Sequence, residues 1–249
     1  MKAFIIHLPE REHSLKFAEH MHKQLLEFGL DSHLHVGTNA EQAMANVAKD
    51  RRVLYPFSIK SRDLTPEEMQ EYIKPELWEA FNFAHTWQVR ERHLVGPKQG
   101  KMSKPGVIGC FYSHYTLWRR CVELNEPIMI FEDDVKFYRG WHPVDWEGVL
   151  ILSLGKNSFL NEPYKTYLEN PSGTPQPMPW RQYSMPGASG YAIKPEAALS
   201  LCKFYRDYFY PADNAINTSI TTLQVHNYLM GRNTLPEEGN ISMTRAKGQ

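Results

Sequence analysis

The sequence contains few cysteines and no long hydrophobic run. Its three cysteines, Cys110, Cys121 and Cys202, are too few and too scattered along 249 residues for a disulfide framework or a zinc cluster. The longest apolar stretches, 127–131 and 148–154, fall far short of the roughly 18 residues that cross a bilayer. The first residues do not build a signal peptide either. We therefore expect free thiols, no transmembrane helix and a cytoplasmic protein.

The sequence also lacks a net charge, because 28 Lys and Arg balance 28 Asp and Glu. This balance argues mildly against tight DNA binding. The hydrophobic content of 42% is enough for a full core, and no internal repeat or low-complexity tract is present. These features predict one enzyme-sized globular domain over residues 1–249.

The hydrophobic spacing predicts alternating strands and helices. Residues 3–8 form a strand in this interpretation, 10–28 a helix, 32–36 a strand and 39–47 a helix, which favours a parallel, Rossmann-like sheet. Further along, we expect helices over 108–124 and 195–205 and strands over 127–131, 149–154 and 189–193. Residues 54–104 are predicted to be an insertion or lid, and 157–181 a long loop.

Three consecutive acids, Glu132, Asp133 and Asp134, directly follow the predicted strand 127–131. The carboxyl end of a strand is where α/β folds place ligands. Adjacent carboxylates repel one another, and a divalent cation relieves the repulsion; oxygen ligands favour Mg²⁺ or Mn²⁺. The alternative is a solvated acidic turn, and the triplet by itself does not decide between them.

The stretch around the triplet carries a family resemblance. It contains a Gly-Cys pair, a Ser-His pair three residues later, a helical tryptophan and a Phe-Glu-Asp-Asp strand end. In order and spacing over about 30 residues, it resembles glycosyltransferase family 25, which includes lipooligosaccharide galactosyltransferases and the domains that modify hydroxylysine in collagen. The matching residues are Gly109, Cys110, Ser113, His114, Trp118 and 131–134.

The resemblance implies an α/β fold of the GT-A type, with a mixed or parallel Rossmann-type sheet flanked by helices. It further implies a nucleotide-sugar donor, usually linked to UDP, and a Mn²⁺ or Mg²⁺ ion on the acidic motif. Glu132 and Asp134 are the predicted metal ligands, with His226 as a candidate third ligand. Asp133 is expected to point toward the sugar or to accept a backbone hydrogen bond.

Other site residues are predicted with an alternative for each. Asp213 matches a family segment that supplies a general base, or it caps a helix over 214–229. His114 contacts the donor or braces its helix, and Arg11 binds the diphosphate or is an exposed cation. Cys110 is expected to be a small core residue. The full set of predicted donor-binding residues is His7, Arg11, Ser113, His114 and Gly190.

The leading hypothesis is a metal-dependent, inverting glycosyltransferase. Its acceptor hydroxyl belongs either to a bacterial surface glycan such as lipooligosaccharide or to hydroxymethylcytosine in phage DNA. The basic stretch 87–104 would grip a phosphorylated acceptor of either class, or is a solvated loop. A catalytically silent nucleotide-sugar-binding module is the alternative function. It is disfavoured because Glu132 and Asp134 are both present, and a silent module has no need to keep acids that repel each other so close together.

Overall fold

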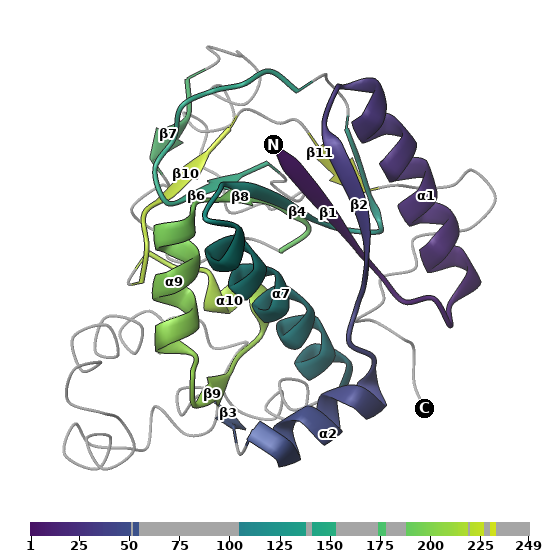
Figure 1. Ribbon diagram of the computed structural model, residues 1–249, viewed down its shortest axis with the longest axis vertical. Coiled ribbons are helices and arrows are strands. Elements are labelled where there is room, and N and C mark those ends of the chain that lie inside the picture. The colour runs from purple at the N-terminus through teal and green to yellow at the C-terminus, as the bar shows by residue number, and fades with distance from the viewer. Residues whose placement is uncertain are drawn as a thin grey trace, which may run out of the picture.

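The computed structural model describes residues 1–50, 52–54, 105–137, 141–152, 174–177, 188–218, 220–226 and 230–232. Its centre is a mixed seven-stranded sheet (Figure 1). All strands of this sheet run in one direction except β8 and β7. In spatial order they are β2 (Asp31–Val36), β1 (Lys2–His7), β4 (Ile128–Glu132), β8 (Gly190–Ile193), β6 (Val149–Ile151), β10 (Leu223–Val225) and β7 (Gln176–Pro177).

Helices cover both faces of the sheet (Figure 1). Helix α1 (Glu12–Glu27) packs on one face. On the other face lie α7 (Pro105–Leu124), with α9 (Pro195–Phe204) and α2 (Ala40–Asp50) against it. The predicted α/β class, with a mixed sheet flanked by helices, is confirmed.

Short elements complete the described fold. Strands β3 (Val53–Leu54) and β9 (Tyr208–Phe209) pair in parallel, and β5 (Val135–Phe137) pairs antiparallel with β11 (Met230–Arg232). Helix α10 (Ala212–Ala215) is a single turn. None of the helices in the described ranges is both long enough and apolar enough to span a membrane.

The alternation of β4 assigns its side chains to two separate cores. Ile128 and Ile130 pack toward α7, while Met129 and Phe131 pack toward α1. Successive side chains of a strand point to opposite faces. The alternation continues past Phe131, so that Glu132 lies on the α7 face and Asp133 on the α1 face.

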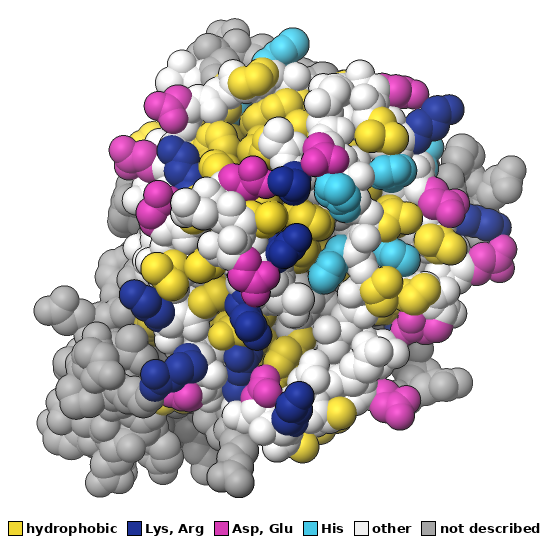
Figure 2. All heavy atoms as spheres, in the orientation of Figure 1, with side chains coloured by type: hydrophobic (Ala, Val, Ile, Leu, Met, Phe, Trp, Pro, Cys, Tyr) yellow, Lys and Arg dark blue, Asp and Glu magenta, His cyan; other side chains and the backbone are white. Residues whose placement is uncertain are grey.

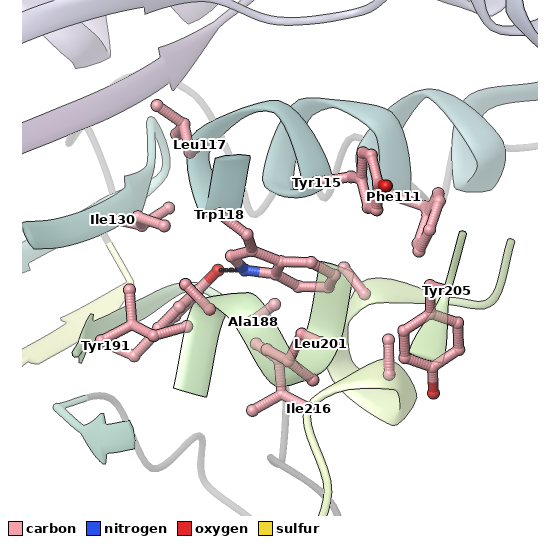
Figure 3. Packing of buried hydrophobic residues seen from close by; sticks show 14 of the residues in the cluster. Phe111, Tyr115, Leu117, Trp118, Ile130, Ala188, Tyr191, Leu201, Tyr205 and Ile216 are labelled. Atoms are coloured by element: carbon pink, nitrogen blue, oxygen red, sulfur yellow. Dashed lines mark hydrogen bonds between the residues drawn. The ribbon is translucent and has the colours of Figure 1, made fainter. Parts of the chain in front are cut away.

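Trp118 of α7 is the centre of the core on the α7 face (Figure 3). It is fully buried, and its ring contacts those of Phe111, Tyr115 and Tyr205. Its Nε1 donates a hydrogen bond of 2.8 Å to the Tyr191 Oη on β8. This bond fastens the helix to the centre of the sheet, as a buried indole N–H requires a partner.

Two expectations about local structure change. Helix α7 begins at Pro105 rather than at residue 108, and proline suits a first helical turn because its missing N–H has no helical partner there. The helix considered over 214–229 is wrong: α10 ends at Ala215, and Leu223 and Val225 are buried in β10. The predictions for 55–104, 157–173 and 178–181 lie outside the described residues.

Candidate functional site

The site lies at one edge of the sheet, where five strands that run in the same direction have their carboxyl ends. β1 ends there at His7, β4 ends at Glu132, and His226 follows β10. The loop that brings the chain back into β8 reaches the same edge, because the Glu132 N–H donates to the Ser189 carbonyl at 2.9 Å. Ligands of α/β proteins commonly bind outside such an edge.

On the α7 face, Glu132 meets two residues that are one helical turn apart. The Cys110 Sγ lies 3.6 Å from the Glu132 Oε1, and the His114 Nε2 lies 3.7 Å from the same oxygen. Residues four apart share one face of a helix, so α7 presents thiol and imidazole together. Within the described residues, this is the one group of three potential metal ligands that converges, with ligand atoms within 4.8 Å of one another.

His114 is held by a buried network. It is fully buried, its Nδ1 lies 2.8 Å from the Tyr191 Oη, and the two rings stack at 5.7 Å. Trp118 can only donate, so the Tyr191 hydroxyl accepts that bond and keeps one proton and one lone pair for His114. The His114 Nε2 is buried without a hydrogen bond and faces Glu132.

Asp133 lies on the opposite face, against α1. It is 1% exposed, and its Oδ2 accepts a hydrogen bond from the Ser14 hydroxyl, which itself accepts from the Leu8 N–H at 2.8 Å. Burial raises the pKa of Asp133 to about 7, and the neighbouring carboxylates of Asp134 and Glu132 add to that rise. The side chain of Asp133, expected to point toward the sugar or to accept a backbone hydrogen bond, thus contacts Ser14 on the α1 face, whereas that of Glu132 lies on the α7 face.

The three predicted metal ligands are not brought into one group of the kind formed by Cys110, His114 and Glu132. Asp134 is half-buried in the turn after β4. His226 follows β10, which is three strands from β4; at about 4.8 Å per strand, this is a backbone separation of about 14 Å. The His226 ring lies instead 6.2 Å from that of Trp141.

Asp213 belongs to α10, next to α7. Its Oδ1 accepts a bond of 3.0 Å from the Asn214 N–H. Burial raises the pKa of Asp213 to about 6, with a further rise from the charge of Glu132 and a lowering from His114. Glu132 and His114, which converge at the end of β4, therefore both affect the pKa of Asp213. A carboxylate with a pKa raised in this way suits a general base near neutral pH.

Comparisons with known proteins match one part of this chain to a glycosyltransferase family. Residues 87–145 match the sequence model of glycosyltransferase family 25, described as an LPS biosynthesis protein. A protein named "Glycosyltransferase 25 family member" from Anopheles gambiae is 52% identical over 33 residues, which are 13% of this chain and 6% of that protein.

The two matches support assignment to glycosyltransferase family 25.

The family 25 match includes α7, β4 and β5 and therefore carries Cys110, His114 and the acidic triplet. Three residues that adjoin these groups lie outside the match: His35, Tyr191 and Asp213. The matched segment supplies one side of the site, and the remaining strands and α10 supply the other.

The other predicted donor-binding residues lie on or beside α7, β1, α1 and β8. The Ser113 hydroxyl accepts from the Thr38 N–H and donates to the Gly109 carbonyl, both at 2.8 Å, and so joins α7 to the loop after β2. His7 is buried at the end of β1, and burial lowers its pKa. Arg11 is half-buried at the N-terminus of α1, and Gly190 is buried in β8 opposite Phe131.

Sequence reasoning did not find three contributors to this site. Cys110 was expected in the core, but it is half-buried beside Glu132, where burial and then the acidic neighbours raise the pKa of its thiol. His35 of β2 has a pKa lowered by burial and by His114 and His7. Tyr191 orients His114. His35 could have been found from the strand pattern of 32–36, in which successive side chains point to opposite faces. Helix α1 and β2 together carry five histidines, and histidines gather over these elements (Figure 2).

Proposed function

We propose that this protein transfers a sugar from a nucleotide-sugar, most simply a UDP-sugar, to an acceptor hydroxyl with inversion. The observation that carries the proposal is the acidic motif at the carboxyl end of β4, in the segment that matches family 25. Asp213 lies on α10 next to α7, and the charge of Glu132 adds to the rise of its pKa. The site thus combines an acidic donor-side motif with a separate carboxylate.

Glu132 and Asp134 are the proposed holders of Mn²⁺ or Mg²⁺, because both offer the carboxylate oxygens that these ions prefer. When bound, the ion would neutralise charge that develops on the departing diphosphate. His226 is not needed in this proposal, since it follows a strand three places away. Asp133 is assigned a positioning role, because its contact with Ser14 joins the acidic turn to α1.

Asp213 is the proposed general base. In an inverting displacement, a carboxylate removes the proton of the acceptor hydroxyl as that oxygen attacks the anomeric carbon from the side opposite the diphosphate. A pKa of about 6 leaves Asp213 ionised at neutral pH while keeping it more basic than an ordinary aspartate. His114 and Tyr191 keep the neighbouring Glu132 side of the site in place.

Calorimetric titration of UDP, with and without Mn²⁺, tests the donor site. We expect Mn²⁺-dependent binding that disappears in Asp134→Ala. Asp145→Ala is the matched control, because Asp145 is fully exposed and pairs only loosely with Lys194 at 3.7 Å. Equal binding by all three proteins, or binding that ignores Mn²⁺, would refute the donor role of the acidic motif.

Turnover separates a transferase from a silent binding module. UDP release from UDP-sugars should rise when the correct acceptor is supplied, and the two acceptor classes to compare are lipooligosaccharide-type glycans and DNA containing hydroxymethylcytosine. Asp213→Asn should bind UDP like the wild-type protein and lose acceptor-dependent turnover. Tight UDP binding without turnover on any acceptor would favour the binding module.

A further inference from the structure

We propose that Cys110, His114 and Glu132 form a binding site for a zinc ion. The proposal concerns the chain without nucleotide and does not require the sugar-transfer function, although it uses Glu132, which is also a proposed ligand of the donor-side ion. Its starting point is the convergence of a thiol, an imidazole and a carboxylate at the end of β4, with the three ligand atoms within 4.8 Å of one another. The types of ligand atom, their spacing and the surroundings of His114 all point to this ion.

The types of ligand atom select the metal. Sulfur and imidazole nitrogen are ligands that Zn²⁺ binds well, whereas Mg²⁺ and Mn²⁺ prefer oxygen. Three protein ligands with a fourth position open is also a common arrangement for zinc in enzymes. The group at Glu132 therefore differs from the oxygen-based set proposed for the diphosphate, although the two share this one carboxylate.

The spacing matches a tetrahedral ion. Zinc bonds of about 2.3 Å to sulfur and about 2.0–2.1 Å to nitrogen and oxygen place tetrahedral ligands about 3.6 Å apart for sulfur and oxygen and about 3.4 Å apart for nitrogen and oxygen. The corresponding separations to the Glu132 Oε1 are 3.6 Å from the Cys110 Sγ and 3.7 Å from the His114 Nε2. The third pair, the Cys110 Sγ and the His114 Nε2, lies within 4.8 Å, against about 3.6 Å for sulfur and nitrogen around a tetrahedral ion.

The surroundings of His114 suit a ligand. Its Nε2 is completely buried, makes no hydrogen bond with any residue that the structure describes, and faces Glu132. Metal-binding histidines usually donate their other ring N–H to a fixed partner, and the Tyr191 Oη is 2.8 Å from Nδ1. That oxygen can accept from both Trp118 and His114, because a hydroxyl has two lone pairs. Zinc binding would then displace the thiol proton of Cys110.

Cobalt substitution tests the site in the nucleotide-free protein. Co²⁺ takes the same ligands and, when bound to a thiolate, gives a charge-transfer band in the near ultraviolet. We expect one Co²⁺ per chain, this band in the wild-type spectrum, and displacement of Co²⁺ by added Zn²⁺. In Cys110→Ser the band should vanish and binding should weaken by at least about 100-fold, since loss of a supporting contact alone costs about 10- to 100-fold.

Two controls keep the result interpretable. Cys202→Ser removes a half-buried thiol on α9 and should retain the band, whereas Asp134→Ala should retain it while losing Mn²⁺-dependent UDP binding. Circular dichroism checks that Cys110→Ser is folded. A wild-type Co²⁺ spectrum without the thiolate band, or identical spectra for the wild type and Cys110→Ser, would overturn the proposal without bearing on the donor site.

Discussion

Replacement of Tyr191 by phenylalanine should destabilise the protein by more than the loss of one oxygen suggests. The Tyr191 hydroxyl is the partner of both the Trp118 Nε1 and the His114 Nδ1, each at 2.8 Å, and all three residues are fully buried. Tyr191→Phe leaves both ring nitrogens without this partner inside the buried core, where the Trp118 indole and the Tyr191 hydroxyl meet (Figure 3).

The size of the stability loss follows from the two buried nitrogens that lose their hydrogen-bond partner. A buried donor or acceptor left without a partner costs about 1–3 kcal/mol, so two such groups cost about 2–6 kcal/mol. We expect about 3 kcal/mol, in the lower half of this range, because the variant no longer buries the hydroxyl itself. Such a loss is a large part of the 5–15 kcal/mol typical of a folded domain.

Urea unfolding followed by circular dichroism measures the change in the free energy of unfolding. Tyr115→Phe is the matched control, because its hydroxyl makes only a long bond of 3.5 Å to the Cys202 carbonyl and should cost about 1 kcal/mol or less. The reasoning is refuted if Tyr191→Phe and Tyr115→Phe agree within about 0.5 kcal/mol. A double variant with Trp118→Phe should lose less than the sum of the two single losses.

Further predictions concern the helix contact and the proposed base. Gly109→Ala should cost about 1–3 kcal/mol in urea unfolding, because a Cβ there would lie 2.4 Å from the Thr38 carbonyl oxygen. Gly106→Ala, with open space around it, should be neutral or stabilising; equal losses would contradict the contact. Turnover should fall about tenfold per pH unit below about pH 6, where Asp213 takes up its proton, and a flat profile would exclude it as the base. Because folding raises this pKa from 3.8 to about 6, the protein loses stability as the pH rises from about 3.8 to about 6 and does not regain it above that range, so Asp213→Asn should melt at a higher temperature than the wild type at neutral pH.

Much of the fold followed from local patterns. Runs of β-branched and aromatic residues and apolar residues at helical spacing predicted β1, α1 and β2 at the start of the chain, and the strand before the acids was predicted within one residue of its observed start. The position of Glu132 at the carboxyl edge followed from the same reasoning, because an acid after a buried strand lies at the edge of the sheet. These features depend on neighbouring residues alone.

These patterns did not predict on which of the two faces of the sheet each site residue lies. Adjacent acids read as one cluster in the sequence, but the pleat sends Glu132 to α7 and Asp133 to Ser14 on α1. His226 is at the predicted edge but three strands away, a distance set by strand order, and nothing in local hydrophobic spacing encodes that order.

Local patterns along the chain were enough to predict the α/β class, the strand that ends in acids and the resemblance to family 25. Which residues meet at that strand end depends on the packing of distant elements. Cys110 was expected to be a core residue because the local sequence gives only its neighbours on the helix. The sequence does not say which strand packs against that side of the helix. The packing of α7 on β4 brings Cys110 and His114 to Glu132, and the pairing of β8 with β4 adds Tyr191. Contacts between distant segments depend on how whole elements bury their apolar faces together, which is a property of the assembled core rather than of any stretch of sequence.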